Sequence, residues 1–408
     1  MAQIPVQANI AINNFEALKC VYKSLSSNEL RERVNVLIDQ FGFKADNDAV
    51  LNESKSLQEA YDYHLYLIQL NNAIIEGKSS SSNKRLLNEH CNTELILKTA
   101  IHGDCTDKIV TLNGSSQYFI IGDIHSDIES LINILETTHF YDNCFEHHWI
   151  FMGDYVDRGT AHLKTTELLL VIANLFSDHV TLLRGNHDGG KLDHEGQLKL
   201  PYRIPDQDNP LDYFPPYLLE LEKKMLQSEP KLLCSYLDWF DKLPYLGLIK
   251  TNIGNFLCVH GGLPKPYFGQ IDVVEFLEKI NVGDAYDYLH SFSDLTQYKT
   301  LDNGGAAIVE QLIWSDPQRG DEEIKFLNKR FKFRASSTDA FLRKFKLKGI
   351  FRGHEVFNKG VEKFHEDQVV SVFSSGSTET TAYGQVQPAL IRLATTGEIE
   401  TIKIKMYK

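Results

Sequence analysis

The chain has 408 residues, of which 42% are hydrophobic and 24% are charged. These values are ordinary for a globular protein and exclude a mainly disordered or fibrous chain. Asp and Glu outnumber Lys and Arg by 55 to 42, and the net charge of −13 disfavours nonspecific binding to nucleic acid or anionic lipid. We therefore expect no nucleic-acid partner and no membrane partner, and any phosphate-bearing ligand needs a local positive site.

The six cysteines are dispersed without a CxxC pair, so neither a zinc knuckle nor a disulfide framework is predicted. The N-terminus lacks the basic segment and following apolar segment of a cleaved secretion signal. No apolar run approaches membrane-spanning length. We expect a soluble protein in a reducing compartment, the cytoplasm.

Two helices are predicted near the N-terminus. A capping box of Ser26 and Glu29 opens a short amphipathic stretch. A second box, Ser56 with Glu59, opens a longer amphipathic stretch that stops at Gly77. Together they indicate a helical N-terminal extension, whose helices are a candidate docking surface for a protein partner.

The serine-rich stretch near residues 77–85 cannot bury apolar surface and predicts a linker or exposed loop. We therefore divide the chain into an extension, residues 1–97, and a larger second domain, residues 98–408. Two long irregular segments, near residues 189–230 and 265–306, are predicted to be insertions in the second domain.

The second domain has the pattern of an α/β fold. Its short apolar runs have the length and composition of strands, and they lie at residues 118–121, 149–152, 180–183, 256–259, 349–351 and 369–373. Helical stretches at residues 127–136 and 163–175 alternate with them. The end of the chain, residues 389–404, alternates without a helix, as antiparallel strands do. We expect a sandwich of mixed β-sheets flanked by helices.

Five of these strands end in a polar loop rich in glycine. The loops have the sequences GDIH (122–125), GDYVDRG (153–159), RGNHD (184–188), HGG (260–262) and GHE (353–355). Loops that follow strands in α/β sheets gather over one edge of the sheet, and glycines let their backbones crowd there. Carboxylate, imidazole and amide groups from five loops are therefore expected to meet.

A single Gly-Asp or His-Gly pair is more often an ordinary turn than part of a site. All five in this order, each behind an apolar run, instead predict a metal centre. One carboxylate can bridge two cations at a spacing of roughly 3.5–4 Å, which lets the pair contact both the attacking and the leaving oxygen of a substrate. Mixed Asp, Asn and His ligation suits manganese, iron or zinc.

These motifs resemble those of the phosphoprotein phosphatases, a branch of the calcineurin-like metallophosphoesterases. The family pattern is GDxHG, GDxVDRG, GNHE, HGG and a later GH, and this chain has GDIHSD, GDYVDRG, GNHDGG, HGGL and RGHEV. The segments LDWFDKLP (237–244) and WSDP (314–317) also look like the corresponding family segments. The resemblance spans about residues 115–375 and implies a metallophosphatase with a metallophosphoesterase-type sandwich.

The resemblance implies a metal-ligand set. One ion is then held by Asp123, His125 and Asp154. The second ion shares Asp154 and is completed by Asn186, His260 and His354.

The resemblance also implies three catalytic side chains. His187 is the general acid for the leaving alkoxide, and Asp157 orients this imidazole and sustains its charge. Arg158 grips the phosphoryl oxygens, for which a bidentate guanidinium is suited. The reaction implied is hydrolysis of phosphoserine or phosphothreonine by direct attack of metal-bound hydroxide, without a phosphoenzyme.

Other arginines have less defined roles. A further phosphate-binding arginine normally follows the WSDP-like segment; Arg330 is favoured and Arg334 is the alternative, while both also fit a solvated basic stretch. Arg184 and Arg352 are candidates for holding the metal ligands in position without binding a metal themselves.

The chain also departs from the family pattern. Ser126 stands where the family usually has Gly, and Asp188 stands where it usually has Glu. Residues 374–377 (SSGS) replace the aromatic and cysteine-bearing loop of eukaryotic members, so toxin sensitivity and substrate contacts are not carried over. These differences indicate a divergent member, for which a secreted effector acting in a host cytosol is an alternative location.

Three functions of different kinds remain open. A phosphorylated protein is the expected substrate, and phosphotyrosine is an alternative to phosphoserine and phosphothreonine because the insertions can reshape the cleft. A small-molecule phosphoesterase, such as a dinucleoside polyphosphate hydrolase, has the same dimetal core. A non-enzymatic scaffold is the third reading, which the complete ligand set disfavours.

Overall fold

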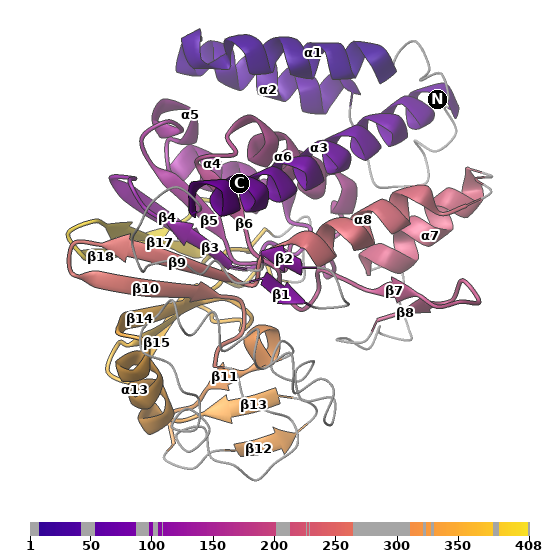
Figure 1. The fold of residues 1–408 in the computed structure, drawn as a ribbon. Coiled ribbons are helices and arrows are strands. Elements are labelled where there is room, and N and C mark those ends of the chain that lie inside the picture. Colours follow the sequence, from indigo (N-terminus) through magenta and orange to yellow (C-terminus); the bar gives the residue numbers. More distant parts are fainter. Residues whose placement is uncertain are drawn as a thin grey trace.

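The computed structural model describes residues 8–41, 54–86, 98–100, 105–107, 109–200, 213–225, 227, 229–263, 311–320, 324–327, 330–377 and 383–406. Two β-sheets form the centre of the molecule, and helices cover them (Figure 1). The mixed-sheet sandwich flanked by helices that the sequence predicts is confirmed.

The first sheet has five strands in the order β18-β17-β4-β5-β6. Its members are β4 (Gln117–Ile121), β5 (His148–Phe151), β6 (Val180–Leu182), β17 (Ala389–Ala394) and β18 (Ile399–Lys403). β4, β5 and β6 are parallel, so their carboxyl ends point to one edge. β17 and β18 form the antiparallel pair expected at the end of the chain.

The second sheet has six strands in the order β15-β16-β14-β10-β9-β3. Its members are β3 (Ile109–Leu112), β9 (Leu246–Thr251), β10 (Gly254–Val259), β14 (Leu347–Arg352), β15 (Val361–Phe364) and β16 (Val369–Val372). β10, β14 and β16 are parallel. All six strand runs predicted in the second domain therefore correspond to observed strands.

The hydrophobic core is layered. Between the two sheets lies a cluster with residues from both, such as Ile120 and Ile150 from the first sheet and Phe256 and Val370 from the second. The other face of the first sheet packs against α4 (Ile128–Thr137), α6 (His162–Leu175) and α8 (Lys231–Lys242). Helix α13 (Ala335–Lys344) covers the other face of the second sheet.

Three longer helices precede the sheets: α1 (Ala8–Val21), α2 (Ser27–Phe41) and α3 (Ser54–Leu86). The predicted capping box is present, because Glu29 N–H donates to Ser26 Oγ at 3.4 Å and Ser26 N–H donates to Glu29 Oε2 at 3.0 Å. No capping box opens α1, and the sequence reasoning missed that helix. α1 and α2 lie side by side, while α3 runs along α8 (Figure 1).

Helix α3 differs from its prediction at both ends. It begins two residues before Ser56, and it continues past Gly77 through residues 77–85, which were predicted to be a linker. A formed helix gains one hydrogen bond for each residue added, so polar residues can extend it at modest cost. Buried residues of all three N-terminal helices join one cluster with those of α4, α6 and α8. The division into two domains stays a prediction.

The remaining elements are short. They are the 3-10 helix η1 (Tyr22–Ser24), α5 (Phe140–Asn143), β1 (Lys98–Ala100), β2 (Cys105–Asp107), β7 (Lys191–Leu192), β8 (Leu198–Lys199), α7 (Phe214–Lys224), β11 (Asp316–Pro317), β12 (Ile324–Leu327) and β13 (Arg330–Phe333). The hairpin of β7 and β8 and helix α7 occupy the first predicted insertion, and the second, near residues 265–306, lies outside the described residues. Among the described helices, none is long and apolar enough to cross a membrane.

Candidate functional site

The ends of the two sheets meet at one edge. Asp123, just after β4, forms a β-bridge with Phe373, just after β16. The loops that follow β5, β6, β10 and β14 meet it there, and their backbones approach closely. A Cβ on Gly153, whose φ is +102°, would lie 2.3 Å from Gly185 N, and one on Gly353 would lie 2.5 Å from Asp123 Oδ1. Glycine is required at both positions because no side chain fits.

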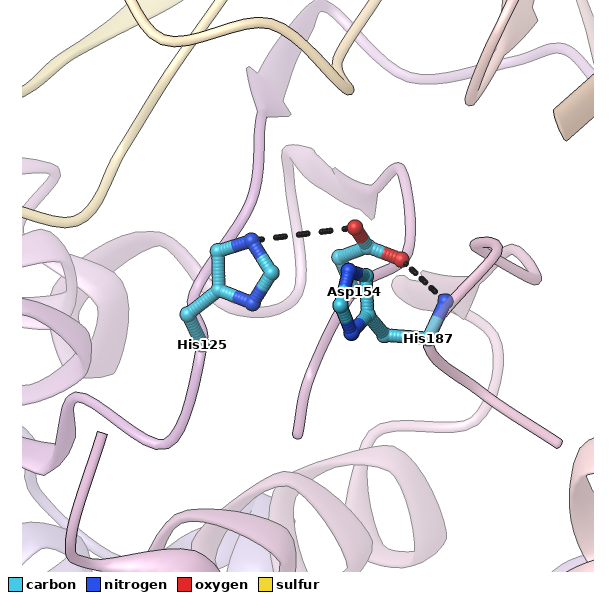
Figure 2. A group of neighbouring side chains, drawn as sticks. All are labelled: His125, Asp154 and His187. Carbon is cyan, nitrogen blue, oxygen red and sulfur yellow. Dashed lines mark hydrogen bonds and ion pairs between the residues drawn. The ribbon is translucent and has the colours of Figure 1, made fainter. Parts of the chain in front are cut away.

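The first group of candidate ligands surrounds the His125 imidazole. Its Nδ1–H donates to the Val156 carbonyl at 3.1 Å, which turns Nε2 toward two carboxylates. His125 Nε2 lies 3.6 Å from Asp123 Oδ2 and 3.7 Å from Asp154 Oδ2. Figure 2 shows His125 and Asp154 facing each other, with His187 beside them. The structure therefore brings together the three side chains predicted for one ion.

The second group lies on the other side of Asp154. His260 Nε2 is 3.3 Å from Asp154 Oδ2 and 2.8 Å from Asn186 Oδ1. His354 Nδ1 is 2.9 Å from the same amide oxygen. Candidate ligand atoms of Asp154, His260 and His354 lie within 4.8 Å of one another. Asp154 is thus shared by both groups, as expected for a bridging carboxylate.

The buried charges in this cluster shift one another's protonation. Burial raises the pKa of Asp123 to about 7. Burial alone would also raise the pKa of Asp154, but the neighbouring His260 and His187 hold it well below its usual value. Burial opposes a charge on His260, yet the Asp154 carboxylate raises the pKa of this imidazole to about 9. The His260 imidazolium therefore places a positive charge beside the shared Asp154 carboxylate.

The donor set fits bound cations. Burial lowers the pKa of His125 to about 4, so this imidazole is neutral at pH 7, and its Nε2 lone pair faces Asp123 Oδ2. That carboxylate oxygen is buried and accepts no hydrogen bond from the described residues. Two buried acceptors facing each other are costly unless a positive group lies between them. Nitrogen and carboxylate ligands of this kind suit a first-row transition metal.

His187 and Asp157 form a pair beside these groups. His187 Nδ1 is 2.7 Å from Asp157 Oδ2, and the backbone N–H of His187 donates to Asp154 Oδ1 at 2.8 Å. The other oxygen of Asp157 accepts a hydrogen bond from Phe214 N–H at 2.7 Å. Both carboxylate oxygens of Asp157 are thus held, which orients the His187 ring.

The same geometry also fits His187 as a metal ligand. Candidate ligand atoms of His125, Asp154 and His187 also lie within 4.8 Å of one another. A carboxylate that holds the far nitrogen of an imidazole is as typical of a metal ligand as of a general acid. The two roles differ in whether loss of His187 removes a metal ion.

Aromatic side chains that sequence reasoning missed lie around Arg158. The exposed Arg158 guanidinium lies 5.8 Å from the centre of the Tyr213 ring, and this ring stacks on His187 at 6.4 Å. The Tyr383 ring lies 5.6 Å from that of His125. Burial raises the pKa of Tyr383 to about 12, while the Arg158 charge lowers it. No spacing motif marks either tyrosine, because both lie outside the five loops that follow the predicted strands.

Asp188 has a structural role that the sequence did not reveal. Its Oδ2 accepts hydrogen bonds from Asp154 N–H at 2.7 Å and Gly185 N–H at 2.8 Å, and its Oδ1 accepts one from Tyr155 N–H at 3.0 Å. Burial raises its pKa to about 6. The Asp188 carboxylate therefore ties the loop after β5 to the loop after β6, and three backbone donors explain why an acidic residue is kept there.

Two of the four other candidate arginines, Arg184 and Arg352, support these loops. Arg184 Nε–H donates to the Asp188 carbonyl at 2.9 Å, and Arg184 pairs with Asp241 at 2.7 Å. The fully buried Arg352 pairs with Asp316 at 2.9 Å and with Glu355 at 2.8 Å. Both candidates thus lie behind the ligand-bearing loops.

The structure does not decide which arginine is the predicted second phosphate-binding residue. Arg330 is the first residue of β13, and its side chain lies outside the described part of the chain. Arg334 immediately precedes α13, where its carbonyl accepts hydrogen bonds from Ser337 N–H and Thr338 N–H. The choice between them stays open.

Several site residues have left-handed backbone conformations that L-amino acids rarely adopt. Positive φ angles occur at His125 (50°), Ser126 (56°), Asp154 (56°), Asp157 (68°) and His354 (74°). Each such residue costs on the order of 1–2 kcal/mol. The conformation of Ser126 explains why glycine is usual there in the family, and its Oγ lies 2.7 Å from His162 Nδ1, a hydrogen bond that offsets part of the cost.

Comparisons with known proteins agree with this geometry. A family model described as calcineurin-like phosphoesterase matches residues 117–357, more than half of the chain. The chain belongs to this family. The family implies a dimetal site, and the two ligand groups around Asp154 lie where such a site is expected.

Two further proteins are similar to this phosphoesterase. Serine/threonine-protein phosphatase rdgC of Drosophila melanogaster is 25% identical over 281 residues, which cover 68% of this chain and 38% of rdgC. The match thus spans less than half of that relative. A protein serine/threonine phosphatase from Saccharomyces cerevisiae, with similarity to human phosphatase PP5, has a TM-score of 0.54 at 19% identity, covering 85% of this chain and 91% of that chain. This likeness shows a shared fold, and the calcineurin-like phosphoesterase family predicted from the motifs is confirmed.

Proposed function

We propose that this phosphoesterase is a protein phosphatase that hydrolyses phosphoserine and phosphothreonine in a single displacement by water, without a phosphoenzyme. The observation that carries the proposal is the convergence of two ligand groups on Asp154 beside the His187–Asp157 pair. The similarity to rdgC supports a protein substrate.

The side chains divide the chemistry among them. Asp123, His125, Asp154, Asn186, His260 and His354 would hold two ions of manganese, iron or zinc. When bound, such ions lower the pKa of water and polarise the phosphoryl oxygens. Arg158 binds the phosphoryl group from the exposed side, since a guanidinium presents two parallel donors to it. His187 gives its proton to the leaving alkoxide, and Asp157 stabilises the imidazolium.

Phosphotyrosine is a second candidate substrate, favoured by the aromatic surroundings of Arg158. The rings of Tyr213 and Tyr383 lie close to the side chains proposed to bind the phosphoryl group. An aromatic ring of the substrate can pack on such side chains at favourable centroid distances of about 4.5–7 Å. Arg330 or Arg334 remains a proposed second phosphate contact.

A substrate panel tests the proposed function. Protein supplied with manganese is assayed on one peptide sequence carrying phosphoserine, phosphothreonine or phosphotyrosine, and on a dinucleoside polyphosphate. We expect kcat/KM on the phosphoserine peptide to exceed that on the nucleotide by at least about tenfold, equivalent to about 1.4 kcal/mol of transition-state binding. Preferential hydrolysis of the nucleotide would replace this proposal with the small-molecule alternative.

The setting of the enzyme is also proposed rather than observed. Four described cysteines, Cys20, Cys144, Cys234 and Cys258, are free thiols. We propose a reducing cytoplasm as the compartment of this enzyme. A secreted effector that works in a host cytosol meets the same condition. The outer helices α1 and α2 are the part of the N-terminal extension that we propose for docking a protein partner.

A further inference from the structure

Helix α3 places a polar side chain against helices α6 and α8 of the predicted second domain. His64, fully buried, lies between α6 and α8. Its Nδ1 is 2.8 Å from the hydroxyl of Tyr236 in α8, and its Nε2 is 3.1 Å from Glu167 Oε2 in α6. The N-terminal extension is therefore joined by hydrogen bonds to two helices that reach the site.

The direction of these hydrogen bonds follows from the partners. An ionised Glu167 carboxylate only accepts, and with Glu167 in that state His64 Nε2 carries the proton and donates it. His64 Nδ1 is then an acceptor, and the Tyr236 hydroxyl donates to it. Burial lowers the pKa of His64 to about 3, so the ring stays neutral and this arrangement persists across the neutral range. His64 and Thr166, whose Oγ1 lies 2.9 Å from the same oxygen, thus fix the hydroxyl end of Tyr236.

The ring of Tyr236 in turn contacts Phe214, whose backbone holds the Asp157 side chain of the Asp157–His187 pair. It meets the Phe214 ring edge to face, with centroids 4.8 Å apart. Phe214 is the first residue of α7, and its backbone N–H donates to Asp157 Oδ1 at 2.7 Å. The opposite oxygen of Asp157 contacts His187 Nδ1. A continuous set of contacts therefore runs from α3 to the imidazole.

A second route leads through α6 to the same region. His162, the first residue of α6, contacts the Phe214 ring at 5.8 Å between centroids. His162 Nδ1 also lies 2.7 Å from Ser126 Oγ, in the loop that carries His125. Glu167, one turn along α6, holds His64 Nε2. Both routes link His64 to the site through other residues, so His64 acts on the site indirectly.

We propose that His64 is a positioning residue for proton transfer, acting through Tyr236 and Phe214 on the Asp157–His187 pair; this inference rests on the proposed phosphatase function. Its consequence is that α3 is part of the catalytic apparatus rather than a detachable appendage. A misplaced acid affects substrates according to their leaving group. An alkoxide from phosphoserine needs the proton, whereas p-nitrophenolate leaves well without it.

Three variants of the full chain test the inference. His64→Leu removes both hydrogen bonds, and His64→Asn keeps an acceptor near the position of Nδ1. Tyr236→Phe deletes one hydroxyl and leaves the ring on Phe214. This milder variant still tests the inference if His64→Leu fails to fold. The matched control is Asn71→Ala. It breaks an equally buried contact of α3, since Asn71 bonds Asn174 and Trp239 at 2.8 Å each. The Trp239 ring packs on Tyr236 at 5.9 Å between centroids, so this variant disturbs the same packing while keeping both His64 hydrogen bonds.

In His64→Leu and Tyr236→Phe, kcat on a phosphoserine peptide is expected to fall about tenfold, a fraction of the full effect of a general acid, while kcat on p-nitrophenyl phosphate falls less than about twofold. His64→Asn should recover most of the loss. Asn71→Ala should lower Tm without changing the ratio between the two substrates. Equal losses on both substrates would overturn the inference.

Hydrogen exchange supplies a readout that needs no activity. The Phe214 amide donates to Asp157, so it should be protected in the wild type and in Asn71→Ala and exchange faster in His64→Leu and Tyr236→Phe. Unchanged protection of this amide in both variants would overturn the inference. If the wild type hydrolyses neither substrate, the proposed function has failed, and the exchange result alone decides whether His64 positions Phe214.

Discussion

Asp154→Asn is expected to lower kcat/KM on a phosphoserine peptide by at least about 10³-fold, because the charge that stabilises two cations is lost. Asp154 belongs to both candidate ligand groups, with Oδ2 at 3.7 Å from His125 Nε2 and 3.3 Å from His260 Nε2. An amide has only one oxygen to offer and no charge. The substitution also weakens the contact of Oδ1 with the His187 backbone.

The measurement for this variant is steady-state hydrolysis with manganese in excess. Asp142→Asn serves as a control, since Asp142 is an acid with an exposed side chain on α5. It should leave turnover unchanged. Turnover of folded Asp154→Asn within about threefold of the wild type would show that this carboxylate does not carry the chemistry.

His187→Ala is expected to lower kcat on a phosphoserine peptide by about 10²- to 10⁴-fold, the usual contribution of a general acid. The loss on p-nitrophenyl phosphate should be much smaller, because its leaving group does not need a proton. The bound metal content should not change. This combination distinguishes an acid held by Asp157 at 2.7 Å from an additional ligand of the first ion.

Asp157→Asn is the companion variant to His187→Ala. It keeps the size of the side chain that contacts His187 and Phe214 but removes the charge that stabilises an imidazolium. We expect a smaller loss with the same dependence on leaving group. If His187→Ala instead loses a metal ion and both substrates equally, His187 is a ligand and another group provides the proton.

Much of the fold and of the site could be predicted from local patterns. Apolar runs of strand length identify strands by composition alone, and glycine, aspartate and histidine at their ends identify the loops. Because the parallel strands β4 and β5 end at the same edge, the approach of Asp123 and Asp154 followed from the order of the elements, whereas that of His354 depends on how the two sheets pack. Their backbone strain, such as φ of 74° at His354, did not follow, since it depends on how the loops crowd.

The side-chain contacts that support the site from outside its motifs could not be predicted. Asp188 looked like a substitution for glutamate, and only its three backbone donors explain it. His64 and Tyr236 are separated by 172 residues, and each is an ordinary amphipathic helix position in the sequence. Side-chain partners of this kind depend on packing between helices, which periodicity does not specify.

The metal content of active protein tests whether side chains from five loops hold two ions at one edge of the sheets. Protein reconstituted with manganese, freed of excess metal and shown to hydrolyse a phosphoserine peptide is analysed for elemental composition. We expect two transition-metal ions per chain, close to full occupancy. Active protein that contains no transition metal would contradict this expectation.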